Sequence, residues 1–178
     1  IHLTDGSRRG IHYAQGNGRE YRSVGRYLVE TGRMELAEVT MDSIRDYIAS
    51  HPWDRDQILQ HNDSFIFFHW SEAGPAVGSL GRPLTRGRSI AVDQRWYPPG
   101  APCFLIARQP VLIGGAVAGW KPLQRFVSVQ DTGSGLVGPG RVDLFWGSGE
   151  AAGRAAGRMK EEGRLLLLLR KESPPAER

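Results

Sequence analysis

Residues 130–147 read QDTGSGLVGPGRVDLFWG, with four glycines and one proline between the carboxylates of Asp131 and Asp143. Strand-like residues flank this glycine-rich segment on both sides. Gly and Pro at this density predict a turn, because glycine adopts the backbone angles that tight turns require. We expect the turn to fold the chain back and to bring the two acids together.

One further aspartate, Asp93, occurs after residue 70, and like the other two it lies in a segment rich in Gly, Pro and Arg. The second half of the chain contains no histidine, since the five present are His2, His12, His51, His61 and His69. Any chemistry in that half is therefore expected to depend on carboxylates.

The periodicity of apolar residues predicts a helical first third, followed by strands that Gly and Pro interrupt. The expected class is mainly β with a few helices. Helices are predicted over 23–30, 40–51, 54–60 and 149–160, the last one ended by Gly163. Strands are predicted over 10–14, 64–68, 89–93, 102–107, 110–113, 125–130, 141–146 and 164–169.

The composition is that of a soluble globular chain: 178 residues, 40% hydrophobic and 24% charged. Its net charge of +4 comes from arginine-rich segments, but no basic stripe with interleaved aromatics is visible, so no nucleic acid partner is expected. Cys103 is alone, which excludes an internal disulfide and a thiolate metal cluster. No metal and no cofactor are expected.

Because the chain opens at Ile1 without a signal-peptide pattern, we expect a fragment or a processed product.

Two enzyme classes use paired carboxylates, and the residues alone leave both open. Residues 131–134, DTGS, spell the nucleophile tetrapeptide of aspartic proteases, which need two such aspartates and hence a dimer of this chain. Glycosidic bond cleavage instead needs one acid for the leaving oxygen and a second group for the anomeric carbon. A purely structural role for Asp131, as a cap of the turn, is equally compatible with the pattern. Asp143 lies mid-strand between two apolar residues, where aspartate is disfavoured, which favours a chemical role.

Three segments in the second half resemble the "3D" domain, which is named for its three aspartates. They are SIAVD at 89–93 with YPPGAP at 97–102, QDTGSG at 130–135, and GRVDLFWGSGEAAG at 140–153. Three segments in the first half resemble the membrane-bound lytic murein transglycosylase A family, which carries that domain: LTDG at 3–6, NGREYRSVGR at 17–26 and NDSFIFF at 62–68.

The resemblance implies a six-stranded double-psi β-barrel, the 3D domain, with a smaller β domain inserted into it. Residues 1–62 would be the C-terminal part of the inserted substrate-groove domain. Residues 63–171 would be the 3D domain, the C-terminal half of the barrel, and residues 172–178 a disordered tail. The fragment alone would expose unpaired strand edges, so we expect little activity from it by itself.

The resemblance also implies a reaction, non-hydrolytic cleavage of the β-1,4 bond between N-acetylmuramic acid and N-acetylglucosamine, which leaves a 1,6-anhydromuramoyl end. Asp143 would be the general acid and base, Asp131 would orient it and tune its acidity, and Asp93 would support the site. Substrate would be bound by Tyr21, Arg22 and Ser23 on one groove wall and by Gly133, Gly135 and Gly138. A barrel that binds glycan without cleaving it, and the dimeric protease, are the alternatives.

Peptidoglycan glycan strands are the partner that the resemblance implies, for a monomer in the periplasm of a Gram-negative bacterium. The expectation extends to a lipid-anchored parent protein at the outer membrane. One departure from the family pattern concerns the second motif, which usually ends in Gly-Ala-Ile-Lys/Arg-Gly. Here Val137 stands at the basic position.

Overall fold

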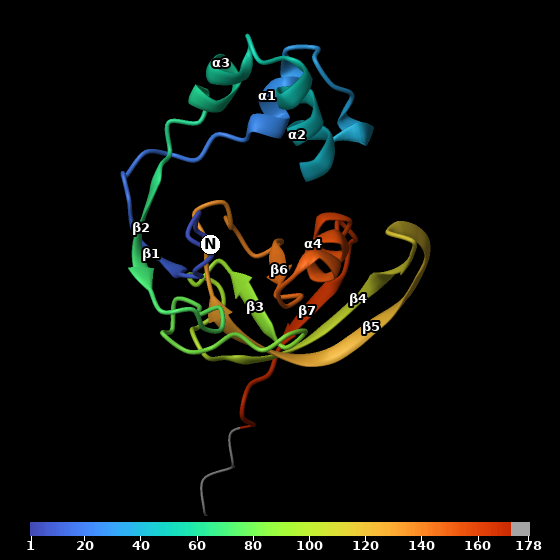
Figure 1. Ribbon diagram of the computed structural model, residues 1–178. Helices are drawn as coiled ribbons and strands as arrows, with labels where there is room; N and C mark the ends of the chain where they lie inside the picture. The colour runs from blue at the N-terminus through green and yellow to red at the C-terminus, as the bar shows by residue number, and fades with distance from the viewer. Residues whose placement is uncertain (172–178) are drawn as a thin grey trace, which may run out of the picture. The chain divides into compact units, whose positions relative to one another are not determined.

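The computed structural model describes residues 1–171, which fall into two compact units, Ile1–Ala76 and a second that begins at Val77. The tail at 172–178, for which disorder was predicted, lies outside the described residues. Strands outnumber helices in the described part, so the prediction of a mainly β chain with a few helices is confirmed. Figure 1 shows the helices and strands of both units.

The first unit combines a two-stranded sheet with three helices. Strand β1 (Gly10–Gly16) pairs antiparallel with β2 (Ile66–Ser71), with a bulge between Tyr13 and Gln15. Between these strands lie α1 (Val24–Glu30), the 3-10 turn η1 (Leu36–Glu38), α2 (Met41–Ser50) and α3 (Arg55–Gln60).

Side-chain caps explain where these helices begin. Ser23 accepts a hydrogen bond from the Arg26 amide at the start of α1. Thr40 and Ser43 form a reciprocal capping box at the start of α2, which satisfies amides that have no partner inside the helix. Leu28 of α1 and Ile58 of α3 are fully buried, so the helices pack through an apolar contact.

The second unit is built on a five-stranded sheet with the order β6-β3-β5-β4-β7. Strand β3 (Ser89–Val92) runs parallel to β5 (Ala116–Asp131), and every other pair is antiparallel. The remaining strands are β4 (Pro102–Ile113), β6 (Val142–Leu144) and β7 (Arg164–Leu167). Helix α4 (Glu150–Gly157) connects β6 to β7, on the side of the sheet toward which the long strands curve (Figure 1).

Alternating side chains on one face of this sheet form the core. In antiparallel strands every second residue points to the same face, so Cys103 and Leu105 of β4 lie beside Val127 of β5. The buried cluster consists of Ile90, Val92, Cys103, Leu105, Leu123, Val127 and Val129. Cys103 is a fully buried core residue, and burial raises the pKa of its thiol.

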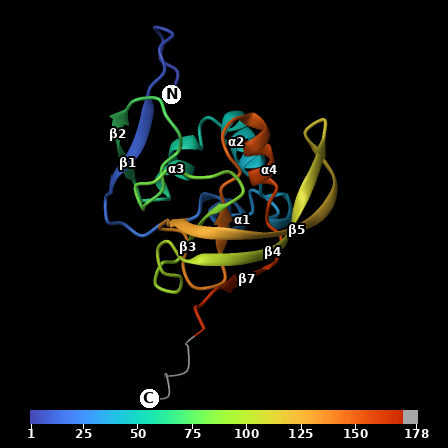
Figure 2. The same ribbon diagram turned by 90° about the horizontal axis from the view of Figure 1, so that it is seen from below.

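Strands β4 and β5 are longer than predicted. The separate strands expected at 102–107 and 110–113 are one strand, and 125–130 is only the end of a strand that starts at Ala116. Beyond Ile106 the outer edge of β4 is unpaired, so Pro110 is tolerated although it has no N–H to donate. The two strands continue past the sheet as a ribbon, clearly seen in Figure 2.

The helix predicted at 149–160 ends earlier, at Gly157, because α4 contains two glycines, and glycine is a poor helix former. Gly163 is therefore not its stop. A Cβ at Gly163 would lie 2.6 Å from the Ile106 carbonyl oxygen, so glycine is required here for close approach to β4.

Candidate functional site

Strand β3 lies between the two aspartates that bracket the glycine-rich segment. Ala91 of β3 pairs with Asp131 of β5 on one side and with Asp143 of β6 on the other. The predicted turn does not make β5 and β6 neighbours. Since adjacent strands are about 4.8 Å apart, the two aspartate backbones are separated by roughly 10 Å.

Both aspartates nevertheless line one cavity of about 400 Å³. Its walls combine the end of β5, the glycine-rich loop that follows, and the facing parts of β3 and β6. The lining residues are Leu84, Ser89, Ile90, Ala91, Asp131, Thr132, Gly133, Ser134, Gly135, Leu136, Arg141, Asp143, Leu144 and Phe145. Small residues at Ala91, Gly133 and Gly135 leave room between the two acids.

Asp143 is the accessible acid of the three. Its side chain is 52% exposed, and its carboxylate faces the guanidinium of Arg141. Arg141 Nε and Nη2 donate to Oδ1 and Oδ2 of Asp143, each over 3.2 Å, and Nη1 donates to the Gly135 carbonyl, also over 3.2 Å. The same two side chains line a second cavity of about 550 Å³ on the side of Met159 and Leu165. Asp143 thus lies at the wall shared by two cavities.

Asp131 is partly buried at the end of β5. Its Oδ1 accepts a hydrogen bond from the Ser79 amide over 2.9 Å. The loop that carries Ser79 approaches β5 closely, and a Cβ at Gly78 would collide with the Gln130 carbonyl oxygen. Asp131 therefore fixes a neighbouring loop while its side chain lines the cavity.

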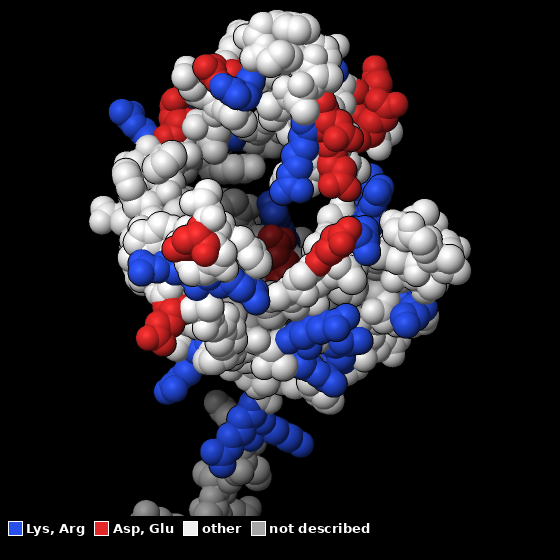
Figure 3. Space-filling model, in the orientation of Figure 1, with Lys and Arg blue, Asp and Glu red and all other residues white. Residues whose placement is uncertain are grey.

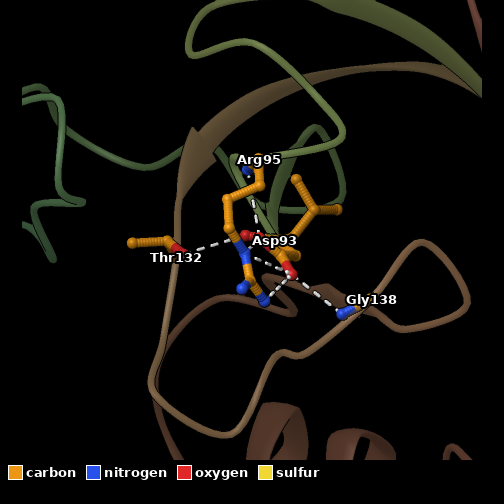
Figure 4. Close-up of polar contacts among 5 residues, drawn as sticks. Asp93, Arg95, Thr132 and Gly138 are labelled. Atoms are coloured by element: carbon orange, nitrogen blue, oxygen red, sulfur yellow. Dashed lines mark hydrogen bonds and ion pairs between the residues drawn. The ribbon is translucent and has the colours of Figure 1, made fainter.

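Asp93 follows β3 and is buried, with only 5% of its side chain exposed (Figure 4). Arg95 donates to it from Nε over 2.9 and 3.1 Å, from Nη2 over 2.6 Å and from its amide over 3.0 Å. The Gly138 amide adds a bond of 2.8 Å to Oδ2. The hydrogen bonds from the Arg95 side chain, followed by that from Gly138, hold the pKa of this carboxyl well below its ordinary range.

The glycine-rich loop is thereby anchored at both ends and in its middle. Gly138, at φ +83°, gives its amide to Asp93, so this predicted substrate-binding glycine uses its donor inside the protein. Leu136 is buried, and Arg141 binds the carbonyl of Gly135. Thr132 Oγ1 donates to the carbonyl of Val92, which ties the start of the loop to β3 (Figure 4).

The predicted groove residues Tyr21, Arg22 and Ser23 belong to the first unit. The Arg22 amide donates to Asn62 Oδ1 over 2.9 Å, and its guanidinium lies 3.7 Å from the Asp63 carboxylate. Ser23 uses its hydroxyl to cap α1, while Tyr21 is exposed.

Charged side chains of both signs are spread over the surface. Basic side chains lie in several separate groups on the face seen in Figure 3, with acidic side chains between them. Within the described part, no three His, Cys, Asp or Glu side chains gather closely enough to hold a metal ion. No described helix is sufficiently long and apolar to cross a bilayer.

Sequence reasoning assigned no role to Arg141, Arg95 or Leu136. A signal for Arg141 existed, because residues two apart in an extended chain point to the same side and Arg141 lies two residues before Asp143. Arg95 lies in a turn after β3, so strand spacing gave no signal for it. Leu136 carried a weaker signal, as an apolar residue within a glycine-rich loop.

Two family models match the chain and cover most of it. The MltA specific insert domain matches residues 1–69, and the 3D domain matches residues 88–169. The second match contains all three aspartates, the glycine-rich loop and the five-stranded sheet. The sheet and its carboxylate-lined cavity therefore define a 3D domain.

Named relatives extend this assignment to both units. The chain is 35% identical over 163 residues to membrane-bound lytic murein transglycosylase A of Vibrio cholerae, covering 91% of this chain and 44% of that protein. A crystal structure of membrane-bound lytic murein transglycosylase from Agrobacterium tumefaciens superposes with a TM-score of 0.80 at 37% identity, over 93% of this chain and 45% of that one. A crystal structure of Escherichia coli MltA with bound chitohexaose gives 0.78 at 30% identity, over 97% and 50%.

The chain belongs to the membrane-bound lytic murein transglycosylase A family and corresponds to its C-terminal part. The resemblance predicted from the sequence is thereby confirmed. The chain spans less than half the length of the curated relatives it matches.

Proposed function

We propose that this chain is part of a peptidoglycan lytic exotransglycosylase that cleaves the bond between N-acetylmuramic acid and N-acetylglucosamine without water. The observation that supports this most directly is Asp143, a half-exposed carboxylate at the rim of a cavity in a 3D domain. Relatives named as lytic murein transglycosylases, one of them solved with bound chitohexaose, supply the reaction class and the kind of ligand.

Asp143 acts first as an acid and then as a base. In its protonated form it donates its proton to the glycosidic oxygen, and the bond from that oxygen to the muramoyl C1 breaks. The resulting carboxylate then accepts the proton of the C6 hydroxyl as O6 forms a bond to C1. The products are a free 4-hydroxyl on N-acetylglucosamine and a 1,6-anhydromuramoyl end, and Asp143 is protonated again.

The substrate supplies the nucleophile, so one catalytic carboxylate is sufficient. Asp131 lines the same cavity and orients the Asp143 side chain. Asp93 supports the site from beneath, since it holds Gly138 and hence the loop that forms one wall. Gly133 and Gly135 line the cavity and leave its floor open for a sugar ring.

The inserted domain contributes glycan contacts through Tyr21, Arg22 and Ser23. Tyr21 is exposed and can stack on a sugar face, whereas Ser23 is committed to its helix cap. We assign residues 1–62 to that domain and 63–171 to the barrel domain.

Part of the five-stranded sheet is proposed to be the C-terminal half of a six-stranded double-psi barrel. Each of its outer strands, β6 and β7, has a partner on one side only among the described residues. Unpaired strand edges tend to recruit further strands. The part of the relatives that this chain does not match would complete the barrel.

The enzyme would act as a monomer on glycan strands in the periplasm of a Gram-negative bacterium, with a lipid anchor at the outer membrane. A lyase of this class removes sugar units in cell-wall turnover and remodelling.

Digestion of purified murein sacculi by the full-length protein tests this proposal. Mass spectrometry should detect products about 18 mass units lighter than the products of hydrolysis, because no water is consumed. Products of hydrolytic mass would contradict the lyase. Sacculus binding without any released product would favour a glycan-binding barrel, and inhibition by a statine-type peptide would revive the protease.

A further inference from the structure

We propose that Arg141 is a positioning residue that fixes the Asp143 carboxylate and couples it to the glycine-rich loop. The proposal rests on the proposed function for the role of Asp143. Its geometric basis is independent, since a single guanidinium binds both the carboxylate and the Gly135 carbonyl.

The place of Asp143 in the fold explains why such a residue is needed. Strand β6 has only three residues and, within the described part of the chain, pairs with β3 alone. The Asp143 side chain is half exposed, so packing restricts it little. A half-exposed aspartate samples several rotamers in water, and each misplaced rotamer removes the carboxylate from the reacting atoms. A two-pronged contact selects one orientation.

Arginine is suited to this task by its shape. Its planar guanidinium presents donors in a fixed fork that matches the two oxygens of a carboxylate, whereas a lysine ammonium has no such plane. The third donor, Nη1, reaches Gly135, so a displacement of the loop would also displace the carboxylate. Arg141 thus links the cavity wall to the candidate acid.

The contact with the Arg141 guanidinium also suits the proton-accepting step of the reaction better than the proton-donating step. Both carboxylate oxygens accept hydrogen bonds from Arg141, an arrangement suited to the ionised acid, whose two oxygens act as acceptors only. The ionised acid is the form that takes the proton of the C6 hydroxyl. The hydroxyl oxygen of the protonated acid is a weaker acceptor, and the exposed position of Arg141 permits the pair to open.

Arg55 supplies a matched control. Its Nε lies 3.2 Å from Asp56 Oδ1, the same distance as in the Arg141 pair, and the two arginine side chains are 59% and 56% exposed. The Arg55 pair lies in α3 of the first unit, and neither residue belongs to the lining of the cavity.

The first experiment measures whether the glycine-rich loop changes position, and it requires no catalytic activity. Two-dimensional amide NMR of the 178-residue chain should show displaced signals for Ser134, Gly135 and Leu136 in Arg141→Gln. The same signals should stay in place in Arg55→Gln. Unchanged loop signals in Arg141→Gln would overturn the coupling, whatever the catalytic result.

The second experiment measures turnover of soluble glycan strands by the full-length protein. Arg141→Gln should lower kcat by about 100-fold, the effect of a misplaced catalytic group, with KM within about twofold. Arg141→Lys should recover part of kcat, and Arg55→Gln should match the wild type. An unchanged kcat, or a change confined to KM, would overturn the positioning role.

The two experiments separate the failure of this inference from that of the proposed function. If the wild type releases no anhydro product while the loop signals still move in Arg141→Gln, the coupling stands and the reaction assignment fails.

Discussion

The 3D domain contains two aspartate–arginine pairs with the same spacing and opposite surroundings. Asp93 pairs with Arg95, and Asp143 pairs with Arg141, in each case two residues apart. The Asp93 side chain is almost completely buried and receives donors from a side chain and from two backbone amides. The Asp143 side chain is half exposed and receives only the two prongs of one guanidinium.

This difference separates a structural carboxylate from an accessible one. The oxygens of Asp93 are committed to protein donors, so no substrate atom can reach them without breaking the loop anchor. An exposed ion pair contributes little to stability, typically about 0–1 kcal/mol, so the Asp143 pair can open at low cost. Burial and backbone donors, rather than residue type, therefore decide which of the two pairs is available for chemistry.

The sharpest test of the comparison is Asp143→Asn. It keeps the size of the side chain but removes the proton that is transferred, so release of anhydro products should fall by about 1,000-fold. Mass spectrometry of sacculus digests measures this release. Thermal unfolding followed by circular dichroism should show Tm within about 2 °C of the wild type, because the pair is exposed. Full activity in this variant would exclude the proposed mechanism.

Asp93→Asn should give the opposite pattern. An amide at this position cannot accept all the donors around it and places one of its own N–H groups against them. We expect Tm to fall by roughly 5 °C. Activity should fall by about tenfold as the loop loosens. Differential scanning calorimetry of the two variants measures both Tm values. If Asp93→Asn were as stable as Asp143→Asn, the two pairs would not differ in their contribution to stability.

The pH dependence of stability offers a second way to separate the pairs. The folded pKa of Asp93 lies below its ordinary value of 3.8, so ionisation of this group stabilises the folded state. The stabilisation is fully present above about pH 5 and is lost as the unfolded chain takes up its proton at lower pH. The Tm difference between wild type and Asp93→Asn should therefore narrow between about pH 5 and pH 3. A difference that stays constant over this range would contradict the assignment.

The sequence predicted the local features of the fold better than the long-range ones. Thr40 and Pro52 bound α2 as expected, because caps and prolines act on their immediate neighbours. The turn between Asp131 and Asp143 was expected to bring the two acids together, but it does not make their strands neighbours. Strand β3, about forty residues earlier in the chain, is inserted between the two acids, and no local pattern encodes that pairing.

The same limit explains the misjudged role of Gly163. A glycine near the end of a helical pattern indicates a stop, yet this one is required by the close approach of β4. The sequence favoured Asp143 for a chemical role because of its mid-strand position, but it did not show how the three aspartates differ in exposure. The burial of Asp93 and the exposure of Asp143 depend on the complete tertiary arrangement.

The smallest expected effect is that of substituting Val137. It tests whether the exposed side of the glycine-rich loop contacts glycan. Val137 lies between Gly135, whose carbonyl Arg141 holds, and Gly138, whose amide Asp93 holds, and its side chain is 70% exposed. Because the two anchors fix the backbone on either side, Val137→Lys should change the free energy of unfolding by no more than about 0.5 kcal/mol.

The added ammonium of Val137→Lys restores the basic residue of the family pattern and should tighten binding of soluble glycan strands by roughly fivefold, about 1 kcal/mol. Isothermal titration with the wild type as control measures this gain. An unchanged affinity would show that the exposed side of the loop makes no contact with glycan, and that the loop serves the site only through the two residues that hold it.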